Sequence, residues 1–141
     1  MSGLIVDTSA LLAYFDASEP DHDAVENDLD ATTDLLIVSP YVVAELDYLL
    51  ATRHGVDAEL AALDELTSGA WELASFGAHD LAQARSIIAK YGDQAIGVAD
   101  ASNVVLAERY RTHTIETLDR RHFDVLRPLG GDRFTVLPRA R

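Results

Sequence analysis

The stretch Gly3-Leu4-Ile5-Val6-Asp7-Thr8-Ser9 opens the chain with an apolar run that ends on a carboxylate. Its three large apolar residues, two of them β-branched, predict a buried strand of a parallel sheet. A helix-compatible segment at residues 10–17 follows at once. Because ligands of open α/β sheets bind beyond the carboxyl ends of the strands, Asp7 is placed where chemistry occurs. A purely structural role is also open, since Asp7, Thr8 or Ser9 could cap the next helix.

Short apolar strands and amphipathic helices alternate along the rest of the chain. Further strands are predicted at residues 35–38, 71–76, 113–118 and 134–137, the last of them at an edge of the sheet. Helices are predicted at residues 8–17, 20–31, 40–53, 57–67, 77–90 and 98–107. This order predicts an α/β fold of three layers, α/β/α, with a mostly parallel central sheet of four to five strands. We find no linker or internal repeat, so residues 1–141 are expected to form a single domain.

The helix predicted at residues 40–53 is apolar around most of its circumference, yet it contains Glu45 and Asp47. Such a helix is expected to be largely buried. A carboxylate buried without a partner takes up a proton or destabilises the fold. At least one of the two acids is therefore expected to have a polar or metallic partner.

Two further acids are notable for their positions. Asp119 ends the strand at residues 113–118 as Asp7 ends the first strand, and the basic cluster Arg120-Arg121-His122 follows it. Asp100 lies in the first turn of the helix at residues 98–107, on the same side as Asn103. The helix dipole alone also favours a carboxylate in a first turn, so the position of Asp100 is compatible with a structural role.

Charge is distributed unevenly along the chain. The formal net charge is -13, which argues against simple electrostatic attraction to nucleic acid. Residues 1–108 contain three basic and 20 acidic side chains, whereas residues 109–141 contain eight arginines and four acidic side chains. Basic character is thus concentrated in the last quarter, either as a solvated surface or as a contact for a polyanion.

The composition excludes several kinds of site. Cysteine is absent, so disulfides, thiolate metal sites and cysteine nucleophiles are excluded, and any metal must be bound by oxygen or histidine. No nucleophile-elbow sequence surrounds a serine, and His22, His54 and His79 lack metal-ligand spacing. The chain has neither a signal-peptide pattern nor 18 consecutive apolar residues, which predicts a soluble, unsecreted protein without a membrane partner.

Four short motifs, taken in this order, resemble those of the PIN-domain nucleases, and among them the VapC toxins of bacterial toxin–antitoxin pairs. They are Ile5-Val6-Asp7-Thr8-Ser9-Ala10-Leu11-Leu12, Ser39-Pro40 with Glu45, Ala99-Asp100-Ala101 with Ala107, and Thr117-Leu118-Asp119-Arg120-Arg121-His122-Phe123. Each motif is weak alone, but together they cover essentially the whole chain.

The resemblance implies a divalent-metal-dependent endoribonuclease whose products carry a 5′-phosphate and a 3′-hydroxyl. By similarity, Asp7 and Asp100 are the main ligands of Mg²⁺ or Mn²⁺, and Glu45 and Asp119 complete the acidic pocket directly or through water. Carboxylates that hold a hard cation can activate water and stabilise charge on a phosphate. The cation would also let an acidic protein bind RNA locally.

The resemblance extends to the surroundings of the acids. Polar residues expected to orient the carboxylates are Thr8, Ser9, Asn103 and Thr117. Basic residues that could contact the RNA backbone are Arg109, Arg111, Arg120, Arg121 and His122.

The implied partners are an RNA substrate, a VapB-like antitoxin whose tail occupies the acidic site, and a second toxin copy in a homodimer, all in the cytoplasm. Two other functions remain open. One is an aspartate-based phosphatase or phospho-acceptor that uses Asp7, and the other is a non-catalytic binding module of the same fold. The phosphatase pattern requires a second aspartate two residues after the first, where this chain has Ser9.

Overall fold

A five-stranded sheet forms the centre of the computed structural model, which describes residues 2–131 and 133–139. The strand order is β3-β2-β1-β4-β5, and every neighbouring pair is parallel. The strands are β1 (Gly3–Val6), β2 (Leu35–Val38), β3 (Glu72–Leu73), β4 (Thr114–Glu116) and β5 (Thr135–Leu137). The predicted parallel sheet of four to five strands is confirmed, and the opening stretch supplies its central strand.

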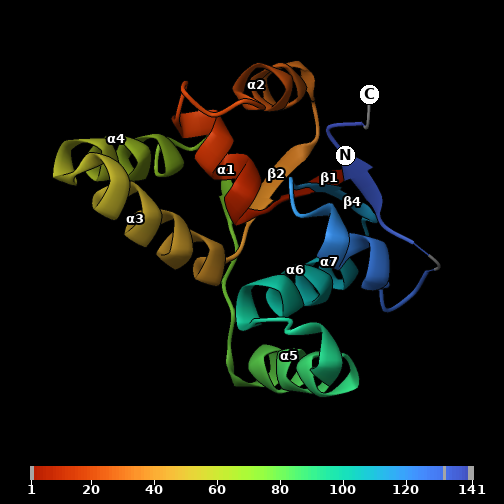
Figure 1. The fold of residues 1–141 in the computed structure, drawn as a ribbon. Coiled ribbons are helices and arrows are strands. Elements are labelled where there is room, and N and C mark those ends of the chain that lie inside the picture. Colours follow the sequence, from red (N-terminus) through yellow and green to blue (C-terminus); the bar gives the residue numbers. More distant parts are fainter. Residues whose placement is uncertain (1, 132, 140–141) are drawn as a thin grey trace.

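Helices cover both faces of this sheet (Figure 1). They are α1 (Thr8–Phe15), α2 (His22–Ala31), α3 (Pro40–His54), α4 (Val56–Leu66), α5 (Ala78–Lys90), α6 (Val98–Arg109) and α7 (Arg120–Val125), with a short 3-10 turn, η1, at Gly92–Gln94. The predicted three layers are therefore present. Among the α-helices of the described residues, α7 alone was not predicted from the sequence. Among the residues that the structure describes, no helix is both long enough and apolar enough to span a membrane.

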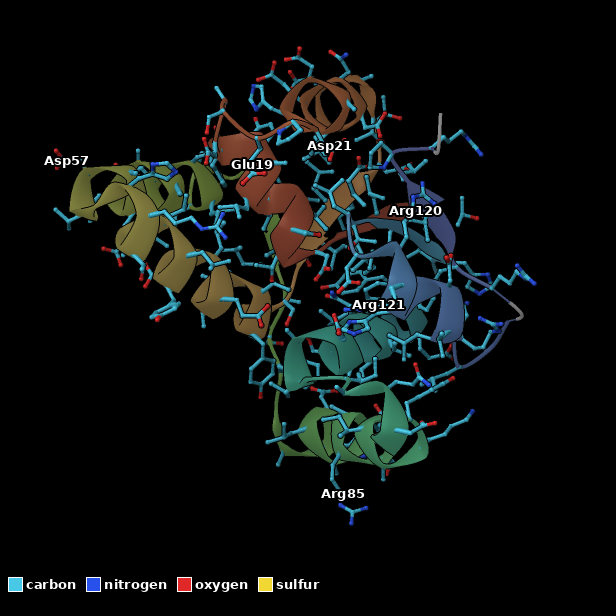
Figure 2. The ribbon with its side chains drawn as sticks, viewed as in Figure 1. Glu19, Asp21, Asp57, Arg85, Arg120 and Arg121 are labelled. Atoms are coloured by element: carbon cyan, nitrogen blue, oxygen red, sulfur yellow. The ribbon has the colours of Figure 1, made fainter. Side chains whose placement is uncertain are left out.

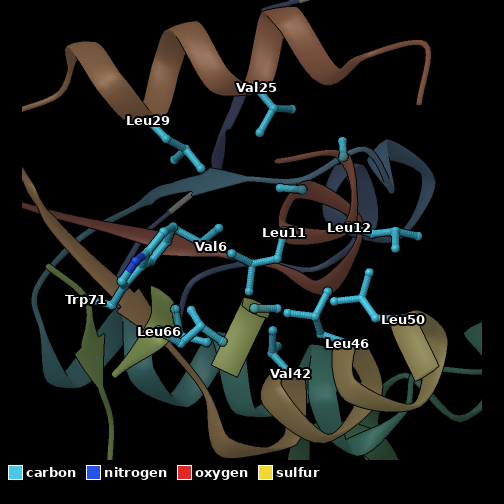
Figure 3. Close-up of a cluster of buried hydrophobic side chains, with 14 of the residues drawn as sticks. Val6, Leu11, Leu12, Val25, Leu29, Val42, Leu46, Leu50, Leu66 and Trp71 are labelled. Carbon is cyan, nitrogen blue, oxygen red and sulfur yellow. The ribbon is translucent and has the colours of Figure 1, made fainter. Parts of the chain in front are cut away.

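Alternation along the strands divides the core into two clusters of buried side chains. On β1, Leu4 and Val6 belong to the cluster that contains residues of α1, α2, α3 and α4, whereas Ile5 belongs to the cluster with residues of α5, α6 and α7. Figure 3 shows the first cluster, in which Leu11 lies between Val6 and Leu46. Since successive strand residues point to opposite faces, the all-apolar sequence of β1 follows from burial on both sides.

The prediction that residues 40–53 form a largely buried helix was wrong. Val42, Leu46 and Leu50 are buried in α3, but Tyr48 is 68% exposed and Glu45 is also exposed. Helix α3 packs along α4 at the side of the molecule, so its outer face meets solvent (Figure 1). Apolar residues around a whole helix therefore do not prove burial when the helix lies at the edge of a fold.

Glu116 is a buried acid that the sequence did not single out. Its side chain on β4 is fully buried, and neither carboxyl oxygen has a hydrogen-bond partner among the described residues. Burial, and secondly the neighbouring Asp28 on α2, raise the pKa of Glu116 to about 9. Glu116 is therefore protonated at neutral pH, as expected for a buried carboxyl group beside a second acid.

Candidate metal centre

The four acids singled out in the sequence come together in one pocket. Asp7 follows β1, Glu45 lies on α3, Asp100 on α6, and Asp119 immediately before α7. All four line a cavity of about 420 Å³. The other residues lining it are Thr8, Ser9, Leu12, Leu49, Ala95, Gly97, Ala99 and His122.

Strand pairing brings the first and last acids together across more than a hundred residues of sequence. The backbone N–H of Asp7 donates to the carbonyl oxygen of Glu116 at 3.0 Å, which continues the parallel pairing of β1 with β4. Asp7 and Asp119 thus leave the sheet at the same edge, the carboxyl end of adjacent parallel strands. This is the position at which ligands of open α/β sheets bind.

The carboxylate of Asp7 is held at both oxygens. Asn103 Nδ2 donates to Oδ1 at 3.0 Å, and Thr117 Oγ1 donates to Oδ2 at 2.8 Å. Asp7 is only 4% exposed. Burial raises the pKa of this carboxyl, an effect that the Thr117 hydrogen bond opposes and that the charges of Glu45 and Asp119 reinforce. The hydrogen bonds orient the Asp7 carboxylate, but burial and the neighbouring acids destabilise its negative charge. A bound cation would offset this destabilisation.

Two hydroxyls extend this network to the other strand-end acid. Thr117 Oγ1 accepts from the backbone N–H of Asp119 at 3.0 Å, and it lies 3.2 Å from Ser9 Oγ. Since Thr117 gives its hydroxyl hydrogen to Asp7, Ser9 must be the donor in that last contact. Ser9 Oγ in turn accepts from the backbone N–H of Leu118 at 2.9 Å. One threonine therefore fixes Asp7 and the start of the Asp119 loop together.

The structural role considered for the opening acid and hydroxyls, a cap on the next helix, is not observed. Asp7 is the N-cap residue of α1, but its side chain makes no capping hydrogen bond. Ser9 bonds to the Thr117–Leu118 segment, and Thr8 Oγ1 donates to Glu45 Oε1 at 2.6 Å. All three side chains are directed into the pocket network instead. The expected polar partner of Glu45 is thus Thr8, although Glu45 itself is exposed.

A pair of buried serines connects the helices that carry Glu45 and Asp100. Ser39 Oγ and Ser102 Oγ are 2.6 Å apart, and Ser102 Oγ also donates to the carbonyl oxygen of Ala99 at 2.7 Å. Ser39 is therefore the donor to Ser102, and it also accepts from the N–H of Tyr41 as the cap of α3. This contact fixes the start of α3 against the first turn of α6.

His122 lies beside two of the four acids, a position that the sequence did not predict. It was grouped with the arginines as a candidate RNA contact, whereas its Nδ1 lies 2.8 Å from Asp100 Oδ2 and 2.9 Å from Asp119 Oδ2. Burial, and next the charge of Asp7, raise the pKa of Asp100 to about 7, and His122 opposes this rise. Residues three apart in a helix share a face. Because α7 begins at Arg120, directly after Asp119, the three-residue spacing of Asp119 and His122 indicates that the two side chains lie together.

The donor set of this pocket fits a divalent cation. Within residues 2–131 and 133–139, the one group of three side chains with ligand atoms close enough to share a metal is Asp100, Asp119 and His122. Carboxylate oxygens suit Mg²⁺ and Mn²⁺. A larger cavity of about 570 Å³ between α1 and α4 contains acids and His54 but no such group.

The charged surface follows the asymmetry of the sequence. Figure 2 shows Glu19, Asp21 and Asp57 on the half built from α1 to α4, and Arg85, Arg120 and Arg121 on the other half. Two of the proposed RNA-contacting arginines bond to other residues of the chain. Arg120 donates to the carbonyl oxygen of Pro138, and Arg109 pairs with Asp80 at 2.9 Å. Arg121 is exposed and lines a smaller pocket that it shares with His122.

Comparisons with known proteins agree with this geometry. The PIN domain family matches residues 4–127. Over 135 residues, which are 96% of this chain and all of the relative, the sequence is 70% identical to ribonuclease VapC26 of Mycobacterium tuberculosis. The solved structure of VapC20 of Mycobacterium tuberculosis, described as a sarcin-ricin loop cleaving toxin, superposes with a TM-score of 0.78 at 20% identity, covering 83% of this chain and 90% of that one. VapBC2 of Rickettsia felis, solved with a DNA fragment of its promoter, gives a TM-score of 0.72 at 18% identity, covering 94% and 97%. These two structures support the fold alone.

Proposed function

Since this chain belongs to the PIN domain family, we propose that it is an endoribonuclease and the toxin of a toxin–antitoxin pair. The observation that carries the proposal is the convergence of Asp7, Glu45, Asp100 and Asp119 in one pocket of about 420 Å³. The relative that is 70% identical over its whole length is named a ribonuclease, which supports the same reaction. Each acid comes from a different element, so the pocket is a built site and not a chance run of acids.

In the proposed reaction, water is added across an RNA phosphodiester bond and leaves a 5′-phosphate and a 3′-hydroxyl. We assign to Asp7 and Asp100, with Glu45 and Asp119, the binding of one or more divalent cations, Mg²⁺ or Mn²⁺. A bound cation lowers the pKa of water and offsets charge on the phosphate. Asn103 and Thr117 orient Asp7, and Thr8 orients Glu45, so the carboxylates need little rearrangement when the cation binds.

Arg121 is the arginine best placed to contact the RNA backbone beside this centre. It is exposed, follows Asp119 by two residues, and lines a pocket of about 270 Å³ with Asp93, Gln94, Ala95 and His122. An exposed guanidinium there can bind a neighbouring phosphate. Arg109 and Arg120, in contrast, are engaged with Asp80 and Pro138.

The geometry disfavours the alternative in which Asp7 acts as a phosphate acceptor. Both of its oxygens accept hydrogen bonds and the side chain is 4% exposed. A nucleophilic carboxylate needs a free oxygen that can reach the phosphorus atom. A fixed, buried carboxylate surrounded by other acids is better suited to holding a cation.

We further propose that residues 1–141 form one PIN-like domain that acts in the cytoplasm. Its partners are an RNA substrate, a VapB-like antitoxin and a second copy of the toxin in a homodimer. Two solved proteins of this fold, described as VapBC2 of Rickettsia felis and VapBC of Salmonella typhimurium, are consistent with the proposed antitoxin.

Mapping of 5′-phosphate RNA ends tests the proposed function directly. Brief expression of the wild type is expected to produce new 5′-phosphate ends at defined sites and to arrest growth, and Asp7→Ala is expected to do neither. Asp57→Ala, which removes an exposed acid on α4, serves as the control and should behave like the wild type. Equal cleavage by the wild type and Asp7→Ala would reject the proposal.

Thr117→Val tests the hydroxyl that orients Asp7. The substitution keeps the shape of the side chain but removes both the bond to Asp7 Oδ2 and the acceptor for the Asp119 N–H. We expect RNA cleavage at saturating cation to fall about 10- to 100-fold, because the loss of groups that orient metal ligands has effects of this size. Thr135→Val, at an exposed position of β5, is the matched control, and its cleavage rate should not change. A Thr117→Val rate within twofold of the wild type would contradict the role of Thr117.

A further inference from the structure

We infer that His122 is a direct nitrogen ligand of the bound cation and that this ligand makes the centre bind Mn²⁺ more tightly than Mg²⁺. The inference rests on the proposed function only in that a cation occupies the acidic pocket. It goes further by adding a ligand that is not an acid and by deriving a metal preference from it.

Distances support the assignment. In a six-coordinate ion with metal–ligand bonds of about 2.1 Å, neighbouring ligand atoms are separated by about 3 Å. His122 Nδ1 lies 2.8 Å from Asp100 Oδ2 and 2.9 Å from Asp119 Oδ2. The nitrogen is therefore spaced from each of the two oxygens as an adjacent ligand of one ion would be, and one ligand atom from each of the three side chains lies within 4.8 Å of the others.

The orientation of the ring supports it as well. Although Nδ1 of His122 is buried and close to two carboxylates, it makes no hydrogen bond of acceptable geometry in the part of the chain that the structure describes. A buried nitrogen that lies this close to two carboxylates without a well-directed hydrogen bond is available to a cation bound between them. A shared cation would satisfy this nitrogen and both oxygens at once.

The same network holds His122 and its two acids in place. The backbone N–H of His122 donates to Asp119 Oδ1 at 3.3 Å, and the N–H of Asp119 donates to Thr117 Oγ1 at 3.0 Å. His122 lies in the first turn of α7, directly after the loop that Thr117 and Ser9 fix. Its ring is therefore positioned by the elements that position the carboxylates, as a ligand must be.

A nitrogen ligand changes the choice of metal. Mg²⁺ binds oxygen ligands almost exclusively and requires near-ideal octahedral geometry. Imidazole binds first-row transition metals well, and Mn²⁺ tolerates a mixed oxygen and nitrogen set. Replacing one water or carboxylate by His122 thus favours Mn²⁺ over Mg²⁺, whereas four acids alone would favour neither strongly.

Pulsed EPR of the Mn²⁺-loaded protein tests the ligand directly. The wild type is expected to show coupling between Mn²⁺ and a directly bound imidazole nitrogen, and His122→Ala and His122→Gln are expected to lose it. His79→Ala removes an exposed histidine at the start of α5 and is expected to keep the coupling. Calorimetric titration with each metal alone should show Mn²⁺ affinity falling about tenfold or more in the His122 variants, with a smaller change for Mg²⁺.

The outcomes separate this inference from the proposed function. Absence of nitrogen coupling in the wild type, or its persistence in both His122 variants, overturns the inference even if the protein cleaves RNA in a metal-dependent manner. Equal losses of Mn²⁺ and Mg²⁺ affinity also overturn it, because they would indicate a structural effect. A wild type that binds neither metal nor cleaves RNA would overturn the proposed function as well. Circular dichroism of each variant verifies that it is folded.

Discussion

Asp100→Asn is expected to reduce RNA cleavage by at least about a hundredfold and, at the same time, to stabilise the metal-free protein above pH 7. Cleavage falls because the variant loses a carboxylate assigned to the cation, a larger loss than that of an orienting group. Stability rises because the amide keeps the shape of the side chain without its charge. In the wild type that charge is partly buried and lies near Asp7 and Asp119.

The direction of the stability change follows from the pKa. The pKa of Asp100 is raised from 3.8 to about 7 in the folded protein. A carboxyl with a raised folded pKa contributes stability that is fully present below its unfolded pKa and is lost as the pH rises through the folded value. The metal-free wild type should therefore lose stability between about pH 4 and pH 8, and Asp100→Asn should lose less.

Thermal denaturation with and without added cation measures both sides of this prediction. At pH 8 without cation, Asp100→Asn should melt at a higher temperature than the wild type. Cation at 100 times its Kd should stabilise the wild type by about 2.7 kcal/mol and the variant by much less. Asp57→Asn, an exposed acid, is the matched control. If Asp100→Asn melted below the wild type at pH 8, the electrostatic description of the centre would be wrong.

Glu116→Gln is expected to remove a large part of the alkaline sensitivity of the fold. Glu116 is fully buried, and burial with the nearby Asp28 raises its pKa to about 9 from an ordinary value of 4.5. Its contribution to stability is thus fully present below pH 4.5 and is lost as the pH rises through about 9. The amide that replaces the carboxyl group in this variant has nearly the same shape and never ionises.

The expected size of the effect is large. Between pH 5 and pH 9, the free energy of unfolding of the wild type should fall relative to that of Glu116→Gln by up to about 1.4 kcal/mol for each pH unit. Urea denaturation across this range measures the difference directly. Glu108 lies on the exposed side of α6, so the free energy of unfolding of Glu108→Gln should change with pH as that of the wild type does. Parallel curves for Glu116→Gln and the wild type would show that Glu116 keeps one protonation state throughout.

Much of the fold could be predicted because it depends on local patterns. The apolar run before Asp7 and its counterpart before Asp119 each predicted a strand, and both strands are present side by side in the sheet. The second strand was predicted to reach residue 118, directly before Asp119, but β4 ends at Glu116. Helix α7 was missed because its six residues contain only two large apolar side chains and no clear period. Because α7 was not predicted, the contact of His122 with Asp119 was not predicted either. Side chains three positions apart lie next to each other in a helix but not in an extended segment.

The burial of acids could not be predicted from their neighbours in sequence. Glu45 has apolar neighbours one turn away but is exposed, whereas Glu116 in a short strand is fully buried. What decides burial is the tertiary position of the element, since α3 lies at the side of the molecule and β4 lies inside the sheet. The roles of Asp7, Glu45, Asp100 and Asp119 in catalysis stay predictions that the variants above can test.

The pairing of β1 with β4 also determines when the acidic pocket can assemble during synthesis of the chain. Asp7 leaves the ribosome early, but Thr117, Asp119 and His122 lie in the last fifth of the 141 residues. Until they emerge, Asp7 lacks its Thr117 hydrogen bond and the pocket lacks one side. A nascent chain that has not yet reached this segment therefore has no assembled acidic pocket, however early Asp7 itself has emerged.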